Sequence, residues 1–518
     1  MTAVLTAYPT ATTFAPAHLD GADWSQVGPL YTSLLARTLK CKGCLENLLL
    51  DRSELDAAVD EAHASLYIEM TRHTDDHEIK AAFLRFVEEI EPNIKDISFK
   101  IDRMIVQCPF ADDLDQNRYH VLFRGLEADV KLFREKNIAL EVDETKLGQE
   151  YSELCGAMTV EFDGEEKTLP QMGPHMQEND RDVREQAFRV VAARRLQDSE
   201  RMDEIFDKMV VLRNTMADNA DLDDYRDWAF HDKHRFDYTP ETCESFHRGV
   251  LEQAVPLMHT MNARHRGAMG VDVLRPWDLD VDPLGREPLR PFNGSTELIE
   301  GTSRIFHRMN PSLGELFDTM RTGDALDLES RKGKAPGGYQ HDRERQRLPF
   351  IFMNAAGLMR DVDTMVHEAG HAFHYMLSRD EPLVSYRQPP SEFAEVASMS
   401  MELIALPFLD EFLSEADAAR ARRRHLEGVV SRLCWVATID AFQHWLYTHP
   451  HHTRAQRDTC WLELHARFGP DVSWECLEAE VGVAFLVAAF SALRKASAQP
   501  GLLVLGDLSI QGNIKPIR

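Results

Sequence analysis

The sequence is poor in cysteine and contains no long hydrophobic run. Eight cysteines among 518 residues are too few for a disulfide-stabilised scaffold, because small domains of that kind are dense in cysteine. The longest apolar run, Val481 to Leu493, is well short of the roughly 20 residues that a membrane-spanning helix needs. The segment before Trp24 contains no Lys or Arg, so we expect no secretory signal there. These absences favour a reduced protein of the cytoplasm with no membrane partner.

Basic residues are scarce relative to acidic ones. The chain has 58 Lys and Arg against 86 Asp and Glu, which gives a formal net charge of −28. An acidic surface repels a phosphate backbone, so we expect no nucleic-acid partner. The hydrophobic fraction of 43% and the charged fraction of 28% are typical of globular proteins and exclude a generally disordered chain.

Apolar residues three and four positions apart dominate the chain and predict helices. Two regions differ: a polar break at 161–172, predicted as a hairpin, and the stretch 326–357. The latter holds the pair Gly337-Gly338 and a predicted strand from Leu348 to Met353. We therefore expect a mostly α protein with a small β element just before its most informative helix. Residues 1–30 should form an extended lead-in, 31–200 an N-terminal helical domain, and 201–518 a second helical domain whose sequence is atypical after about 480.

The informative helix is expected to begin near Asp361, which can cap it, and it contains His367-Glu368-Ala-Gly-His371. Positions 367 and 371 lie one helical turn apart on one face, so both imidazoles can reach one metal ion. Glu368 lies beside them and can accept a proton from a metal-activated water. The pattern favours a zinc site, and a helix with two surface histidines is the alternative.

A catalytic zinc ion usually has three protein ligands. The longer motif with a third histidine is absent, because Leu377 occupies that position. A second helix is predicted to follow Pro389-Pro390. Glu395 lies on the polar face of that helix, with Glu392 about one turn earlier. The residues alone leave both glutamates as candidates for the third ligand.

Five segments, in the same order, resemble one known family. They are GKAPGGYQ at 333–340, LPFIFMNAAG at 348–357, DVDTMVHEAGHAFH at 361–374, PSEFAEVASMSMEL at 390–403 and FQHWLYTHP at 442–450. These segments resemble the oligoendopeptidase F branch of the thimet oligopeptidase family of zinc metallopeptidases. The resemblance implies a helical zinc-metallopeptidase fold with a deep channel that admits short peptides, and it makes residues 201–518 the catalytic zinc-binding domain.

By the same resemblance, the cofactor is one zinc ion held by His367, His371 and Glu395, with Glu368 as the catalytic base. A water on such an ion has a pKa of roughly 7, so it can attack a peptide carbonyl near neutral pH. The predicted function is zinc-dependent hydrolysis of bonds inside short peptides.

Further residues are expected to support this chemistry. The resemblance makes His374 and Glu402 the partners that orient the metal ligands. The strand from Leu348 to Met353 can pair with the substrate backbone. The segment Gly337-Gly338-Tyr339 can close over the bound peptide.

The C-terminal part departs from the family. Family members carry a His and several Tyr near the C-terminus that contact the substrate and the developing oxyanion, but here the last histidine is His465 and the last tyrosine is Tyr447. Loss of one oxyanion donor typically lowers the rate about 10²–10³-fold. Two alternatives to an active endopeptidase therefore remain: a catalytically impaired zinc-binding pseudopeptidase or truncated family member, and a zinc carboxypeptidase.

Overall fold

The computed structural model describes residues 14–475, and the atypical segment after about Glu480, with its apolar run, lies outside the described residues. The first helices are α1 (Trp24–Leu35), α2 (Lys42–Arg72), α3 (His77–Arg85), α4 (Glu91–Val106), α5 (Gln116–Leu132), α6 (Glu135–Gly156), α7 (Arg181–Leu196), α8 (Ser199–Asn219) and α9 (Tyr225–Asp232). They are followed by α10 (Pro240–Gly249), α11 (Val255–Met269), α12 (Ser295–Met309), α13 (Pro311–Thr322), α14 (Met359–Ser378), α15 (Ser391–Ala405), α16 (Glu415–Thr448) and α17 (Arg454–Phe468). The prediction of a mostly α fold is confirmed.

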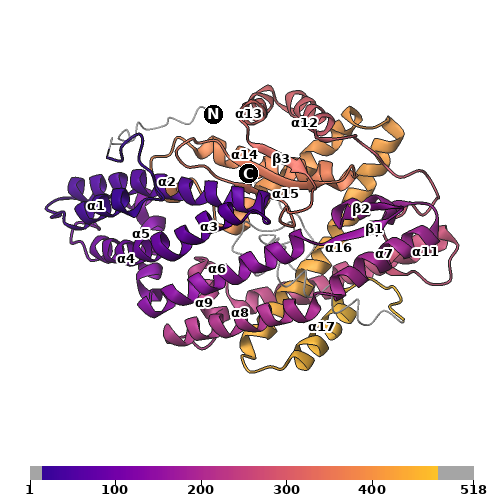
Figure 1. Ribbon diagram of the computed structural model, residues 1–518, viewed down its shortest axis with the longest axis horizontal. Coiled ribbons are helices and arrows are strands. Elements are labelled where there is room, and N and C mark those ends of the chain that lie inside the picture. Colours follow the sequence, from indigo (N-terminus) through magenta and orange to yellow (C-terminus); the bar gives the residue numbers. More distant parts are fainter. Residues whose placement is uncertain (1–13, 476–518) are drawn as a thin grey trace.

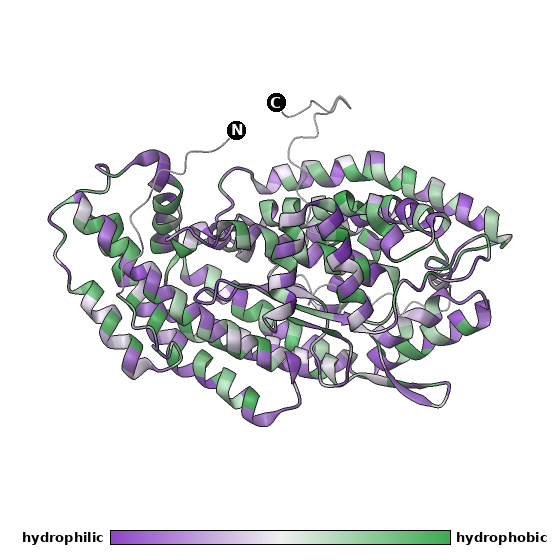
Figure 2. Ribbon diagram, turned by 90° about the horizontal axis from the view of Figure 1, so that it is seen from above, coloured by the Kyte–Doolittle hydropathy of each residue, from purple (hydrophilic) through white to green (hydrophobic). Residues whose placement is uncertain are grey.

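Amphipathic helices build three main cores. Green and purple alternate along most helices in Figure 2, as expected when each helix buries one face. The first core joins α1, α2 and α4, where Leu45, Leu48 and Leu55 are fully buried on one face of α2. The second joins α6, α8, α16 and α17, and the third surrounds α14. In Figure 1 these cores lie at the left, below the centre and above the centre.

Part of the acidic excess caps helices. The side chains of Asp76, Asp115, Asp180 and Asp224 accept hydrogen bonds from backbone N–H groups in the first turns of α3, α5, α7 and α9. A carboxylate at this position satisfies donors that have no partner within the helix and opposes the positive end of the helix dipole. Several helices therefore begin where the sequence supplies a cap.

Two small sheets interrupt the helices. Strands β1 (Thr159–Phe162) and β2 (Glu165–Thr168) form the predicted hairpin. Strands β3 (Leu326–Glu329), β4 (Tyr339–His341) and β5 (Phe350–Ala355) form a sheet in the order β3-β5-β4. β5 is the predicted strand, and it pairs in parallel with β3 and antiparallel with β4. Because both of its edges are occupied, the expectation that this strand pairs with the substrate backbone is wrong.

Helix α14 lies against this sheet and carries the motif. It begins at Met359, and its N-cap is Leu358. The sequence suggested Asp361 as the cap, and this prediction is wrong, because Asp361 lies in the first turn of the helix. Its carboxylate accepts hydrogen bonds of 2.8 Å from the backbone N–H groups of Leu358 and Ala356, so it still ties the start of the helix to the preceding loop.

The helices α14 and α15 pack closely because Gly370 has no side chain. A Cβ at Gly370 would lie 2.7 Å from Cα of Ser398.

The predicted small β element beside the motif helix is confirmed. Helix α1 begins at Trp24, within the expected lead-in 1–30, and the division of the chain at residues 31 and 201 stays a prediction. None of the described helices has the length and apolar character needed to cross a bilayer.

Candidate metal centre

The two histidines of the motif face the same point. His367 and His371 lie one turn apart on α14, with their ring centroids 4.9 Å apart and their planes at 85°. Both side chains are buried, in a helix whose opposite face packs into the core with Val362, Val366 and Phe373. The apolar face fixes the rotation of α14 and thereby directs both imidazoles toward α15.

Helix α15 is amphipathic in the inverse sense. Its polar residues Glu395, Ser398 and Glu402 are buried against α14, while Phe393 and Ile404 on the other face are 65% and 52% exposed. A surface helix normally buries its apolar face. A helix that buries carboxylates and exposes aromatic and aliphatic groups must satisfy its acidic groups inside the protein, which is typical of a functional site.

Glu395 completes a three-residue group. Its Oε2 lies 3.5 Å from Nε2 of His367, and its Oε1 lies 3.7 Å from Nε2 of His371. One ligand atom from each of the three residues lies within 4.8 Å of the others. Nε2 of both histidines and Oε1 of Glu395 are buried, and within residues 14–475 none of these three atoms has a hydrogen-bond partner. Three buried donor atoms that converge without partners fit a cation, since burial of an unpaired polar group is costly.

Glu392, the other candidate for the third ligand, points elsewhere. Its carboxylate accepts a short hydrogen bond from the hydroxyl of Tyr238 and lies 3.8 Å from Nε of Arg235. Of the two glutamates, only Glu395 belongs to the three-residue group.

Glu402 orients the first histidine. Its Oε1 lies 2.7 Å from Nδ1 of His367, and both side chains are buried. Arg432 of α16 donates to both oxygens of the same carboxylate at 3.2 and 3.0 Å, and Nε2 of His425 lies 3.4 Å away. Burial alone would raise the pKa of Glu402, but the hydrogen bonds from His367 and Arg432 outweigh burial and lower it. The anionic form holds the proton of His367 on Nδ1 and leaves Nε2 directed at the candidate ion.

Burial perturbs the other titratable groups in directions that favour a cation. Burial, and then the charge of His367, lower the pKa of His371 to about 3, so this imidazole is neutral. Burial raises the pKa of Glu395 to about 7 against the attraction of His367. Burial likewise raises the pKa of Glu368 to about 7. A divalent cation between the carboxylate and the imidazoles would compensate for their loss of hydration.

Glu368 faces a cavity of about 580 Å³. Its carboxylate accepts a hydrogen bond from the backbone N–H of Gln340 in the edge strand β4. Gly337 and Gly338 line the same cavity. A Cβ at Gly338 would lie 3.8 Å from Oε1 of Glu368, so a glycine there leaves room for a ligand beside the carboxylate.

Tyr339 has a different environment from the two glycines. It is not among the described residues that line this cavity. Its hydroxyl forms a 2.6 Å hydrogen bond with Thr71 of α2, and its ring stacks on Phe352 with centroids 4.7 Å apart. The contact with Thr71 holds β4 against α2, and the stacking on Phe352 holds it against β5.

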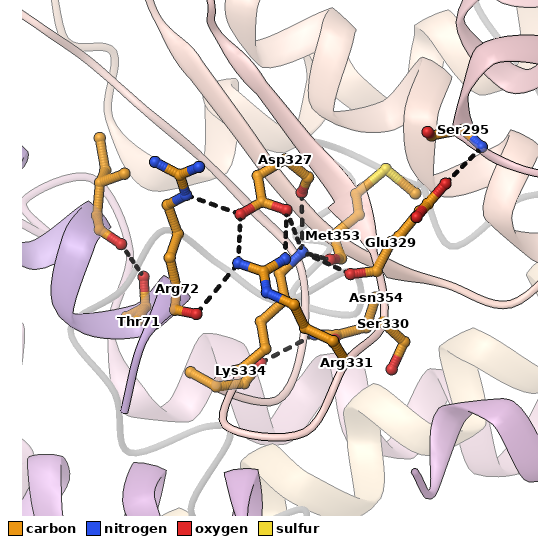
Figure 3. Close-up of polar contacts among 12 residues, drawn as sticks. Thr71, Arg72, Ser295, Asp327, Glu329, Ser330, Arg331, Lys334, Met353 and Asn354 are labelled. Carbon is orange, nitrogen blue, oxygen red and sulfur yellow. Dashed lines mark hydrogen bonds and ion pairs between the residues drawn. The ribbon is translucent and has the colours of Figure 1, made fainter. Parts of the chain in front are cut away.

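A buried lysine fixes the loop that carries the glycines. Nζ of Lys334 donates to the carboxylate and the backbone carbonyl of Asp327 and to the carbonyls of Glu329 and Met353. Figure 3 shows the side chains of Lys334 and Arg331 directed at Asp327, with Arg72 of α2 on the other side. The loop between β3 and β4 is thus tied both to the sheet and to α2, which positions Gly338 beside Glu368.

Besides these residues, the predicted His374 and four unpredicted residues lie near the site. His374 is half-buried on α14 and, within the described residues, forms no hydrogen bond with the three candidate ligands. Arg432 and His425 were not predicted, because they lie in a highly charged helix with no motif. Arg195 and Arg360 line the cavity, and neither forms an ion pair in the described part of the chain. The sequence does not predict that these two arginines share a cavity, because α7 and α14 lie far apart in the chain and come together only in the fold.

Comparison with known families identifies the class of protein. Residues 175–480 match the model of peptidase family M3, and residues 14–133 match the model of the peptidase M3 N-terminal domain. The chain therefore belongs to peptidase family M3. Within that family, its relatives support the oligoendopeptidase F branch, as the sequence motifs predicted.

Two relatives match this chain only distantly in sequence, and one solved structure matches it closely in fold. The chromosomal oligoendopeptidase F of Lactococcus lactis subsp. cremoris is 24% identical over 154 residues, which are 30% of this chain and 25% of that protein. Group B oligopeptidase PepB of Streptococcus agalactiae is 21% identical over 197 residues, 38% of this chain and 32% of that protein. The matched segments thus span only a quarter to a third of these relatives. The solved structure of PZ peptidase A with an inhibitor has a TM-score of 0.86 at 27% identity and covers 92% of this chain and 86% of that one.

Proposed function

We propose that the protein is a zinc-dependent oligoendopeptidase, a metalloendopeptidase that hydrolyses bonds inside short peptides. The observation that carries this proposal is the convergence of three buried donor atoms without partners, Nε2 of His367, Nε2 of His371 and Oε1 of Glu395. Two imidazoles and one carboxylate are a donor set of catalytic zinc sites. We therefore assign one zinc ion to these residues.

Zinc, when bound, supplies a Lewis acid for the peptide carbonyl and makes a water nucleophilic near neutral pH. Glu368 is the base of the chain itself: it would take a proton from the attacking water at a carboxylate oxygen and deliver it to the leaving amine nitrogen. The pKa of about 7 that burial gives Glu368 suits both transfers. Glu402 keeps Nε2 of His367 directed at the metal, and we keep His374 as a second orienting residue.

The position of β4 at the edge of its sheet supports binding of an extended peptide. The backbone N–H of Gln340 is directed at Glu368, and backbone groups two residues apart in a strand point to the same side. Gly338, directly before β4, leaves open space beside Glu368, since a Cβ there would lie 3.8 Å from Oε1 of Glu368. A peptide can therefore add along this edge as a further strand with little sequence preference. Gly337 and Gly338 are the proposed substrate-binding residues, and Tyr339 supports them through its contacts with α2.

The charge of the cavity supports a preference within that substrate class. Arg195 and Arg360 lie along the cavity without ion-pair partners among the described residues, so a carboxylate of the substrate would be favoured there. We propose short peptides of the cytoplasm as the substrates, with no nucleic-acid or membrane partner.

The test uses an internally quenched peptide that is blocked at both ends. Glu368→Gln keeps the size of the side chain and removes the base, so kcat should fall about 10²–10⁴-fold, while the zinc content measured by elemental analysis stays at the wild-type level. Glu415→Gln, at a site whose side chain is 79% exposed, is the matched control and should change neither quantity. Equal cleavage by the wild type and Glu368→Gln would refute the proposal.

The same assay separates the alternatives. A wild-type protein that binds zinc but cleaves no peptide is the impaired pseudopeptidase. A protein that cleaves peptides with a free C-terminus, and leaves the doubly blocked peptide intact, is a carboxypeptidase.

A further inference from the structure

A second group of metal-ligating side chains lies between α10 and α16. Helix α10 carries Cys243 and His247 four residues apart, and α16 carries Asp440 and His444 four residues apart. Residues at this spacing lie on one face of a helix. The two helices pack against each other, so each presents a pair of potential ligands to the other.

The distances bring three of these residues to one point. Ligand atoms of Cys243, Asp440 and His444 all lie within 4.8 Å of one another. Oδ2 of Asp440 lies 3.5 Å from Nε2 of His444 and 2.7 Å from Nε2 of His247. Cys243 and His444 are each only 9% exposed. The group is therefore a buried cluster with one sulfur, one carboxylate and two imidazoles.

We propose that Cys243, Asp440 and His444 form a second binding site for a divalent transition metal, with zinc as the ion that suits it best. Thiolate and imidazole are the donors that zinc selects, and a carboxylate completes a common ligand set. His247 lies 2.7 Å from Oδ2 of Asp440 and holds this carboxylate in place, as outer partners of metal ligands do.

The cluster is not satisfied by its own hydrogen bonds. Nδ1 of His444 is buried and has no hydrogen-bond partner among the described residues. The hydrogen bonds between Asp440 and the two histidines explain neither the unpaired Nδ1 of His444 nor the position of the Cys243 sulfur beside them. A metal ion bound by this group would explain the position of the sulfur.

The position of the site gives it a structural consequence. His444 packs edge-on against Phe230 with ring centroids 6.5 Å apart, and Phe230 packs in the same manner against Tyr238 at 5.7 Å. Tyr238 donates to Glu392 at the start of α15. A metal that joins α10 to α16 would thus stabilise the position of Tyr238, which contacts α15 one turn before Glu395.

The test relies on the sulfur, because the candidate site on α14 and α15 has none. The full chain with Cys41→Ser and Cys44→Ser, which removes the exposed Cys41 and the partly exposed Cys44, is loaded with Co²⁺ and with Zn²⁺. We expect two metal equivalents per chain by elemental analysis and a thiolate-to-cobalt charge-transfer band in the near ultraviolet.

Three variants of this protein locate the band. Cys243→Ala should lose the band and one equivalent, and Cys434→Ala, which removes another buried cysteine on α16, should lose neither. His371→Ala should lose one equivalent and keep the band, so failure of the proposed catalytic site is distinguishable from failure of this one. If Cys243→Ala does not fold, His444→Gln takes its place. A background protein without the band, or a band that survives in both Cys243→Ala and His444→Gln, would overturn the proposal.

Discussion

Glu402→Gln should weaken zinc binding although Glu402 touches no metal in the proposed site. The substitution keeps the size of the side chain and removes the charge that faces Nδ1 of His367 at 2.7 Å. It also leaves Arg432 opposite a neutral amide in place of a carboxylate that it contacts at 3.0 Å. His367 then loses the partner that fixes its tautomer and the rotation of its ring.

The magnitude follows from the burial of the pair. His367 and Glu402 are 1% and 3% exposed, so water cannot replace the lost contact. Loss of such an outer partner typically lowers metal affinity by about 10–100-fold, which corresponds to about 1.4–2.8 kcal/mol. Zinc affinity is measured by competition with a chromophoric chelator at neutral pH. Glu392→Gln, on the same helix, is the control and should bind zinc as the wild type does. Wild-type affinity in Glu402→Gln, or lost affinity in Glu392→Gln, would refute the assignment of these glutamates.

Three further variants test the substrate site beside β4, the loop held by Lys334 and the ion pairs of Asp278. Gly338→Ala should lower kcat/KM about tenfold or more at unchanged zinc content, because its Cβ would lie 3.3 Å from the carbonyl of Phe352 and 3.8 Å from Glu368; unchanged kinetics would exclude a substrate at the edge of β4. Lys334→Met should lower the free energy of unfolding in urea by about 3 kcal/mol, because several buried acceptors lose their shared donor; a loss below the error of the measurement would contradict this. Burial alone would raise the pKa of Asp278, but hydrogen bonds from the Arg181 side chain, the Arg275 backbone N–H and the Arg184 side chain outweigh it and lower the pKa from 3.8. The stabilisation by Asp278 is therefore complete above about pH 4 and is lost as the pH falls through the lowered pKa. The stability deficit of Asp278→Asn should therefore shrink in acid, and a deficit that is independent of pH would contradict the assignment.

Sequence patterns predicted the features that lie within a single helix or strand. The spacing of His367 and His371 was enough to place both imidazoles on one face, and the β5 strand was predicted from a short apolar run. The pairing of β5 was not predictable in this way, because the partner strands β3 and β4 are defined by contacts rather than by their own sequences. The start of α14 was placed two residues late for a similar reason: Asp361 ties the helix to the preceding loop from within the first turn.

The contacts between helices lay beyond the sequence pattern. Glu392 and Glu395 are three residues apart, so a helical wheel cannot say which one meets α14 and which one meets Tyr238. The inverse amphipathicity of α15 is visible only once the neighbouring carboxylates and imidazoles are known to be buried. Arg432 and Arg195 come from helices that carry many other arginines, and only the fold singles them out.

The proposed hydrolysis depends on one zinc ion held by His367, His371 and Glu395 beside Glu368. The most direct measurement is anomalous diffraction at the zinc edge from crystals of the zinc-loaded protein. We expect an anomalous peak about 2.0–2.2 Å from Nε2 of both histidines and from a carboxylate oxygen of Glu395. Full zinc occupancy elsewhere in the crystal, with no peak between α14 and α15, would contradict it.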